Sequence, residues 1–380
     1  MKVTIAVDSF KGSLTSLEAG QAVADGIKRV YPDCEICIRP LADGGEGTVQ
    51  ALTCGMGGEL KSVTVTGPLG APLECSYGII REKKTAVIEM ASAAGITLLK
   101  EEERNPLFTT SYGVGEMIKD AVYEGCRRFV IGIGGSATND GGVGMLQALG
   151  FDMLDENGAQ VPRGAIGLER LVEIRDEHVI PELRECSFRI ACDVTNPLCG
   201  EDGCSAVFGP QKGADPAMVM RMDEWLRHYA ALAGEKYMQA NPYQPGAGAA
   251  GGLGFAFLTF TNASLESGVQ IVLEETSLEE YVKDADWVIT GEGRLDGQTV
   301  MGKAPVGVAA AAKKYGRKVL AFSGCVARDA VWCNAKGIDA FFPVLRSVEP
   351  LEEVMRPENA RQNLIDTCEQ VFRLVRTMEF

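Results

Sequence analysis

The segment 3–39 reads VTIAVDSFKGSLTSLEAGQAVADGIKRVYPDCEICIR, and it decides the fold. An apolar run at 3–7 predicts a buried strand, and the polar residues after it predict a loop. Thr15 and Glu18 have the spacing of a capping box, and apolar residues then recur at helical intervals. A second apolar run at 34–39 predicts another strand. A strand, a helix and a strand in this order are typical of a parallel α/β sheet.

The same alternation returns near the end of the chain. Residues 286–290 predict a strand, 305–315 a helix and 318–322 a further strand. Between the two regions, short strands joined by turns interrupt the alternation before it resumes. We therefore expect an α/β protein with two domains. Residues 1–66 and 286–380 would share one discontinuous parallel-sheet domain, and residues 67–285 would form an inserted α/β domain.

Composition narrows the functional class. The chain has 380 residues, of which 52 are acidic and 37 basic, so its net charge is −15. Nucleic acid is not expected as a partner, because phosphate backbones are neutralised by lysine and arginine. The 12 cysteines are scattered, and the single C-x-x-C, Cys34 to Cys37, lies within an expected strand, so we expect reduced thiols. The apolar N-terminal run is too short for a signal peptide, and the uncharged stretch 237–265 is interrupted by proline and glycine. A cytoplasmic, soluble protein that does not bind membranes is expected.

The stretch GQTVMGKAP at 297–305 resembles the phosphate-binding P-loop G-x-x-x-x-G-K-[ST], with Ala304 in place of the hydroxyl residue. A P-loop directly follows its strand, whereas seven residues (291–297) separate the expected strand from the x-x-x-x run. Alanine also cannot coordinate a metal, so we expect no P-loop here. The segment 291–304 is predicted instead to be a long loop at the carboxyl end of a parallel strand, where open α/β sheets bind ligands.

Two further loops are expected at the same edge of the first domain. The first carries Asp8 and Lys11, and the second carries Asp43 and Glu46 among glycines that allow close approach of a ligand. Together with 291–304, these loops bring lysines and carboxylates to one rim. Lysines bind phosphate and carboxylates bind magnesium, so the rim has the groups that phosphoryl transfer requires.

Two glycine-rich segments lie in the middle of the chain. Residues 132–137, GIGGSA, fit a relaxed dinucleotide-binding pattern, and Asp152 falls where a ribose-binding acid would lie. An NAD(P)-dependent dehydrogenase of a small hydroxy acid is therefore an alternative. Against it, residues 138–142 break the direct entry from strand to helix, and the segment equally suits a cradle of backbone amides for phosphate or nucleotide. Residues 246–251 fit G-x-G-x-x-G but follow a proline-rich turn, and they suit tight packing as well as ligand approach.

A further polar group follows the expected strand 187–192. Asp193 and Asn196 come after this strand, and Lys212 lies in a later turn. Asp193 either acts on a ligand or only forms a turn through its own backbone.

Together these segments resemble the type-1 glycerate kinase family, the bacterial glycerate 2-kinases. No single motif is decisive, but their joint occurrence in the family's order is highly specific. The matching runs are 8–11, 42–48, 132–142, 192–198, 208–213, 245–254 and 289–305.

The resemblance implies ATP-dependent phosphorylation of glycerate with Mg²⁺, giving 2-phosphoglycerate. It also implies a two-domain α/β protein whose discontinuous domain is Rossmann-like and whose active site lies in the cleft. Asp193 would act on the acceptor hydroxyl, Lys11 would meet phosphate, and Arg294 would pair with the glycerate carboxylate. Asp296 or Glu292 would hold magnesium.

The resemblance also implies a wider set of binding positions, in which Lys303 would meet phosphate and residues 136–142 would cradle the nucleotide. The residues expected to bind substrate or nucleotide are Asp8, Ser9, Asp43, Gly44, Gly45, Glu46, Gly134, Gly135, Ser136, Asn139, Asp140, Asn196, Lys212, Gly291, Glu292, Gln298, Thr299 and Lys303.

A non-catalytic sensor of small acids is the remaining alternative. Four or more carboxylates at the expected site argue against it, because a protein that only binds anions would avoid them. The expected partners are small molecules, glycerate and ATP, and the sequence neither requires nor excludes a homodimer.

Overall fold

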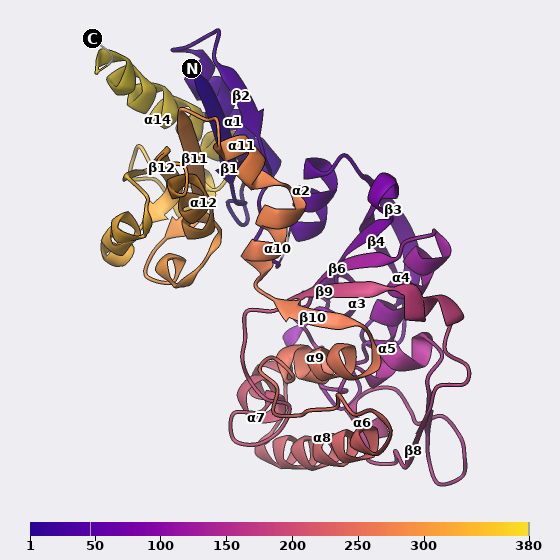
Figure 1. Ribbon diagram of the computed structural model, residues 1–380. Helices are drawn as coiled ribbons and strands as arrows, with labels where there is room; N and C mark the ends of the chain where they lie inside the picture. Colours follow the sequence, from indigo (N-terminus) through magenta and orange to yellow (C-terminus); the bar gives the residue numbers. More distant parts are fainter. Residues whose placement is uncertain (46, 379–380) are drawn as a thin grey trace. The chain divides into compact units, whose positions relative to one another are not determined.

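The computed structural model describes residues 1–45 and 47–378, and the chain forms two compact units (Figure 1). Unit 1 comprises residues 1–43, 50–56 and 269 onward, and unit 2 comprises 44–49 and 57–268. The expected boundaries after residues 66 and 285 differ from these. Strand β3 (Glu59–Thr66) belongs to unit 2, because it pairs along its whole length with β4 (Pro72–Ile80).

Unit 1 is built on a five-stranded parallel sheet that joins both ends of the chain. Strand β1 pairs with β11, from Val3 opposite Trp287 to Val7 opposite Gly291. The expected α/β class, with a parallel sheet built from both ends of the sequence, is therefore confirmed. The strands, in sheet order, are β13 (Ala340–Pro343), β12 (Lys318–Val326), β11 (Trp287–Leu295), β1 (Lys2–Val7) and β2 (Glu35–Ile38).

Helices cover both faces of this sheet. Helices α1 (Ser16–Lys28) and α14 (Pro357–Thr377) pack with Ile5 and Phe322 in one apolar core, where each fully buried side chain contributes roughly 1.5–3 kcal/mol. The predicted capping box begins α1, since Thr15 Oγ1 accepts the N–H of Glu18 at 3.2 Å and the Glu18 carboxylate accepts the N–H of Thr15 at 2.9 Å. The other helices are α2 (Thr48–Gly55), α10 (Gly268–Glu275), α11 (Leu278–Val282), α12 (Ala304–Lys313) and α13 (Leu351–Val354).

Strand β11 is longer than the sequence predicts. The prediction ended it at residue 290 and treated 291–304 as a loop, which is wrong for residues 291–295. Glu292 pairs with Ser323 of β12, and Leu295 pairs with Val326. The extension depends on this pairing with a distant strand, which a local run of glycines and charges does not reveal.

Unit 2 contains a six-stranded mixed sheet. Strands β10 (Ala263–Glu266), β9 (Ser187–Ala191), β6 (Arg128–Gly132) and β5 (Thr85–Glu89) are parallel, whereas β4 and β3 continue the sheet as antiparallel strands. A separate two-stranded antiparallel sheet is formed by β7 (Asp152–Leu154) and β8 (Glu173–Arg175). The carboxyl ends of β5, β6 and β9 therefore share one edge.

The helices of unit 2 surround a second apolar core. The uncharged stretch 237–265 carries a helix of 12 residues, α9, whose backbone has positive φ at residues 250–252. Among residues 1–45 and 47–378, no helix is both long and apolar enough to cross a membrane. The helices are α3 (Ala91–Ala94), α4 (Tyr112–Tyr123), α5 (Val143–Ala148), α6 (Ala165–Leu168), α7 (Cys204–Phe208), α8 (Pro216–Lys236) and α9 (Ala249–Phe260).

Candidate active site

Three carboxylates gather at the strand ends of unit 1, and we call Asp8, Asp43 and Glu292 the carboxylate cluster. Asp8 directly follows β1, where its N–H donates to Gly291 O at 2.9 Å, and it is only 5% exposed. Burial, and then the charge of Asp43, raise the pKa of Asp8 to about 7. Burial also raises the pKa of Glu292, which is 7% exposed, and the charges of Asp296 and then of Asp43 add to this rise. The cluster therefore holds negative charge at an electrostatic cost.

Two lysines interact with the carboxylate cluster. Lys11 Nζ lies 3.4 Å from Asp43 Oδ2, and its side chain is 59% exposed. Lys303 is the N-cap residue of α12, and its charge opposes the rise in the pKa of Glu292. In the described part of the chain, no group of three or more histidine, cysteine or acidic side chains is arranged so that it could hold a metal ion by itself. The donors of the cluster are all carboxylate oxygens, which are the ligands that Mg²⁺ prefers.

The two expected magnesium ligands have different surroundings. Glu292 belongs to the carboxylate cluster, and its Oε1 accepts a hydrogen bond of 2.5 Å from Thr299 Oγ1. Asp296 instead accepts the N–H of Gln298 at 2.9 Å and lies 3.3 Å from Nε of Arg294. Arg294 is exposed, with its guanidinium beside Asp296. Of the expected pair, Glu292 is therefore the better placed to share a cation with Asp8 and Asp43.

The near-P-loop segment does not offer its amides to a phosphate. Residues Thr299–Met301 form the 3₁₀ turn η6, in which Met301 N–H donates to Gln298 O at 3.0 Å. The N–H groups of Gly302 and Lys303 both donate to Thr299 O at 3.3 Å. A P-loop cradles phosphate with backbone N–H groups of this kind, so the geometry agrees with the expectation that no P-loop is present.

In unit 2, two loops leave neighbouring strands at one edge of the sheet. Strands β6 and β9 pair in parallel, with Gly132 opposite Ala191, so the following loops start about 5 Å apart. Asp193 is exposed, and its Oδ1 accepts the N–H of Gly268 at 3.4 Å. Gly44 packs against the same edge with a φ of +89°, and a Cβ there would lie 2.8 Å from Cβ of Ala191. The backbone at this edge is therefore tightly packed, while the carboxylate of Asp193 remains exposed.

The loop after β6 exposes its glycines and turns its carbonyl groups inward. Gly134 and Gly135 are exposed. Gly135 has a φ of +74°, and its carbonyl accepts the N–H of Ile96 at 2.8 Å. Ala137 N–H donates to Ala94 O at 2.8 Å. These bonds hold the loop in one conformation without using the N–H groups of the glycines.

Lys212 lies behind this loop and is 2% exposed. It ends the 3₁₀ turn η5 (Pro210–Lys212), and its Nζ donates to Ser136 Oγ at 2.8 Å and to Thr138 O at 2.6 Å. Burial lowers the pKa of Lys212 to about 8. The sequence identified this lysine as a binding residue, but not that it would be buried against the glycine loop.

Asp140 and Asn139 are fully buried, and their polar groups serve the interior of unit 2. The Asp140 carboxylate accepts the N–H and the hydroxyl of Ser111, both at 2.8 Å, and the N–H groups of Gly142 and Gly144. Asn139 Nδ2 donates to Ser205 Oγ at 2.8 Å. These contacts give both residues a structural role in holding the loop.

The remaining expected positions are less informative. Asn196 Nδ2 donates to Asp202 O at 2.9 Å, and Ser9 N–H donates to Asp8 Oδ1 at 2.6 Å. Gly45 O accepts the hydroxyl of Thr48 at 2.7 Å. Glu46 lies outside the described residues.

The second glycine-rich segment, 246–252, packs against both site loops. A Cβ on Gly251 would lie 2.0 Å from Thr138 O, and one on Gly248 would lie 2.2 Å from Pro197 O. Gly141 N–H also donates to Gly251 O at 2.9 Å. Of the two interpretations left open by the sequence, this geometry favours tight packing.

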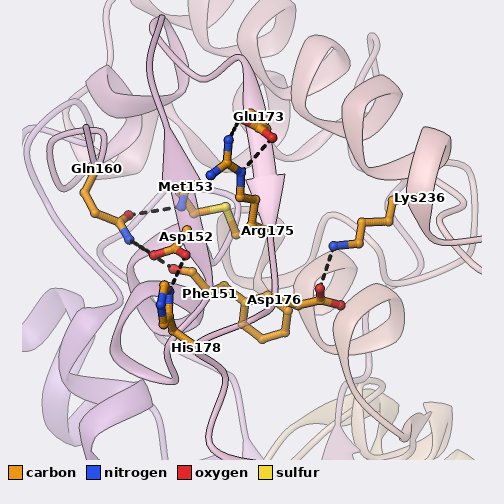
Figure 2. A network of polar contacts seen from close by, with 9 residues as sticks. All are labelled: Phe151, Asp152, Met153, Gln160, Glu173, Arg175, Asp176, His178 and Lys236. Carbon is orange, nitrogen blue, oxygen red and sulfur yellow. Dashed lines mark hydrogen bonds and ion pairs between the residues drawn. The ribbon is translucent and has the colours of Figure 1, made fainter. Parts of the chain in front are cut away.

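The carboxylate of Asp152 already interacts with residues close to strands β7 and β8. Figure 2 shows its carboxylate between Gln160, whose Nε2 donates to Oδ1 at 3.0 Å, and His178, whose Nδ1 lies 2.6 Å from Oδ2. A separate ion pair between Asp176 and Lys236 appears in the same view. Ten residues, 133–142, separate β6 from α5. Neither feature matches a dinucleotide fold, in which the helix follows the glycine turn directly.

Glu89 is a site-edge residue that the sequence analysis missed. It ends β5, and its Oε1 accepts the N–H of Val49 at 2.9 Å, which ties Val49 to the end of this strand. Its signal was an acid at the end of an apolar run, the same signal that identified Asp193.

Buried carboxylates and lysines at the carboxyl ends of parallel strands define an α/β enzyme that handles anions. The glycerate kinase family pattern matches residues 3–376, and the chain belongs to this family. It is 48% identical to "Glycerate kinase" of Haemophilus influenzae, over 99% of both chains, and 47% identical to "Glycerate 2-kinase" of Escherichia coli, over 94% of this chain and 93% of the other. The crystal structure of "putative glycerate kinase 2" from Salmonella typhimurium is similar, with a TM-score of 0.92, 43% identity, and 100% and 99% of the two chains covered. The family resemblance seen in the sequence is confirmed, and the chain is an enzyme of a kinase family.

Proposed function

We propose that this enzyme transfers a phosphoryl group from ATP to glycerate and gives 2-phosphoglycerate. The relatives named glycerate kinase or glycerate 2-kinase support the substrate and the position of transfer. The observation that carries the chemistry is the carboxylate cluster with Lys11 and Lys303 beside it, because phosphoryl transfer needs both a cation site and donors to phosphate. A metabolic enzyme of the cytoplasm fits this proposal.

Magnesium fits the carboxylate cluster. Asp8 and Asp43 repel each other, and Glu292 adds to the repulsion, so a divalent cation shared by these side chains would offset the cost. When bound, Mg²⁺ neutralises negative charge on the transferring phosphate. Lys11 binds the same phosphate from the exposed side of the cluster, and Lys303 holds it at the start of α12.

Asp193 acts on the acceptor hydroxyl. Its exposed carboxylate at the end of β9 either accepts the proton of this hydroxyl or fixes the direction of its attack on the γ-phosphorus. The new O–P bond forms as the bond to the leaving ADP oxygen breaks. The proton of the hydroxyl passes to the Asp193 carboxylate if Asp193 acts as the base, and to solvent if Asp193 only directs the attack.

The dehydrogenase alternative lacks a supporting contact, since Asp152 is bound to His178 and Gln160. The sensor alternative does not explain why the carboxylates of Asp8 and Glu292 are buried, because a protein that only binds small acids has no need of them.

Incubation of the protein with ATP, Mg²⁺ and glycerate, followed by ³¹P NMR, tests the proposal. A product phosphate on the 2-oxygen is expected. A 3-phosphate would correct the position, and the absence of any transfer would refute the proposed function.

A further inference from the structure

The most unusual charge in unit 2 is the buried ammonium group of Lys212. No salt bridge joins it to an acid among the described residues, and its two partners are the uncharged Ser136 Oγ and Thr138 O. Asp140 is near enough to favour the charged form, but its carboxylate oxygens are occupied by Ser111 and by backbone N–H groups. A buried cation without a paired anion is costly, so the fold maintains this charge for a partner that is not part of the protein.

The loop in front of Lys212 offers donors to such a partner. The N–H groups of Gly134, Gly135 and Ser136 donate to no acceptor within residues 1–45 and 47–378. Gly134 and Gly135 are exposed, and the φ of +74° at Gly135 is the conformation used by nests of N–H groups that bind anions. The loop is also rigid, because its carbonyl groups are bonded to Ile96 and Lys212.

The position of the loop identifies the anion. The loop and Asp193 leave neighbouring strands of one sheet, and their starting residues, Gly132 and Ala191, are in register. The segment 246–252 contacts both, since a Cβ on Gly246 would lie 3.3 Å from Val194 O and one on Gly251 would lie 2.0 Å from Thr138 O. An anion bound here lies beside the group that Asp193 activates.

We propose that the loop 134–136, with Lys212 behind it, binds the carboxylate of the acceptor hydroxy acid. In a 2-hydroxy acid the carboxylate and the reacting hydroxyl are on adjacent carbon atoms, so both must bind at one place. A single lysine matches the single charge of a carboxylate, whereas we expect a triphosphate to bind, with its cation, at the carboxylate cluster of unit 1. This inference rests on the proposed function. It assigns the glycerate carboxylate to unit 2 and no longer to Arg294, whose guanidinium lies beside Asp296.

Lys212 is a positioning residue, since it acts through Ser136 and through its charge. The test compares Lys212→Met with Lys83→Met, which removes an exposed lysine before the amino end of β5, at the opposite edge of the same sheet. Titration calorimetry measures the affinity of both variants for glycerate, for its neutral amide 2,3-dihydroxypropanamide, and for ADP with Mg²⁺.

Lys212→Met should weaken glycerate binding by about 10- to 100-fold, which is the typical contribution of hydrogen bonds to a charged group, and should leave ADP binding unchanged. The amide should be affected much less, so the preference for the acid should collapse. Lys83→Met should change none of these affinities. Loss of ADP affinity in Lys212→Met would assign the loop to the nucleotide, and equal losses for acid and amide would reduce Lys212 to a structural role. A loss of glycerate binding confined to Arg294→Met would return the carboxylate to unit 1.

A measurement on the unaltered enzyme covers the case in which Lys212→Met does not fold. With ¹⁵N-labelled glycine, the amide resonances of Gly134 and Gly135 should shift with glycerate and not with ADP or the amide. Unmoved resonances would overturn the assignment. If the unaltered enzyme transfers phosphate to glycerate while these tests fail, only this inference fails. If it transfers none, the proposed function fails first.

Discussion

In unit 1 the carboxylates at the strand ends are buried and Lys11 is exposed, whereas in unit 2 Lys212 is buried and Asp193 is exposed. The difference follows the chemistry expected of each edge. Clustered carboxylates suit a cation and the phosphates that it accompanies, with an exposed lysine beside them that a phosphate can reach. A buried lysine behind a rigid glycine loop suits a small anion of fixed shape, with the exposed carboxylate left for its hydroxyl.

The largest expected effect separates the two edges through Asp193 and Lys11. Asp193→Asn should lower kcat by about 10²–10⁴-fold, the usual contribution of positioned acid–base catalysis, and should change ATP affinity little. Lys11→Ala should lower kcat and also weaken ATP binding, by about tenfold or more, because it removes the charge that we propose binds the phosphates.

Steady-state kinetics and nucleotide titrations of both variants check this contrast. Near-normal turnover in Asp193→Asn would leave Asp193 as a turn-forming residue, and the base would then be sought among Asp8, Asp43 and Asp296.

The carboxylate cluster should make the ligand-free enzyme less stable as the pH rises. The pKa of Asp8 is about 7 in the folded protein and 3.8 in an unstructured chain, so the unfolded state releases its proton first. Stability associated with Asp8 is complete below about pH 4 and is lost up to about pH 7, by at most about 4 kcal/mol.

Asp8→Asn should therefore be more stable than the unaltered enzyme at pH 8 and equally stable at pH 4, while losing activity. Urea unfolding at both pH values in the presence of EDTA measures this, with the exposed Asp33→Asn as the matched control in unit 1. A variant that is destabilised at pH 8 would show that the carboxylate is not strained by burial.

The local pattern of the chain was enough to predict much of the fold. The capping box at Thr15 and the strand–helix–strand order at both ends identified unit 1, because these signals depend on residues close in sequence. The extension of β11 depends on β12, and the placement of β3 in unit 2 depends on its hairpin with β4, so neither was predictable from local pattern. The turn at 208–213 and the family resemblance likewise identified Lys212 and Asp140 as site candidates. Only the packed structure shows that Lys212 is buried with no acid partner among the described residues, and that the Asp140 carboxylate already accepts hydrogen bonds from Ser111 and from backbone N–H groups.

The rigidity of the unit 2 loop can be tested at Gly251. Its φ is +67°, and a Cβ would lie 2.0 Å from Thr138 O, the oxygen that accepts a hydrogen bond from Lys212 Nζ. Gly251→Ala should therefore cost about 2 kcal/mol or more beyond Gly158→Ala, because Gly158 has a φ of +74° and no atom of the described residues within 4 Å of an added Cβ. Thermal and urea unfolding of the two variants give the difference. Equal losses of unfolding free energy in the two variants would mean that the loop deforms to accept the methyl group, and the loop of unit 2 would then not be rigid.

The smallest effect is expected for a substitution at Ala304. This substitution tests the proposal that unit 1 binds its cation through the carboxylate cluster alone. Ala304 is fully buried as the first residue of α12, and the N–H groups of Gly302 and Lys303 before it are bonded to Thr299 O. A serine hydroxyl at this position would complete the P-loop pattern in sequence, but it would be added to a turn whose amides are directed inward. Ala304→Ser should therefore leave the dependence of the rate on magnesium unchanged within about twofold, because we propose that Asp8, Asp43 and Glu292 hold the cation. Rates measured over a range of Mg²⁺ concentrations, with Asp43→Asn as the variant expected to weaken magnesium, provide the check. A clear gain in magnesium affinity in Ala304→Ser would place the cation at the start of α12. The segment 297–305 would then act as a P-loop after all.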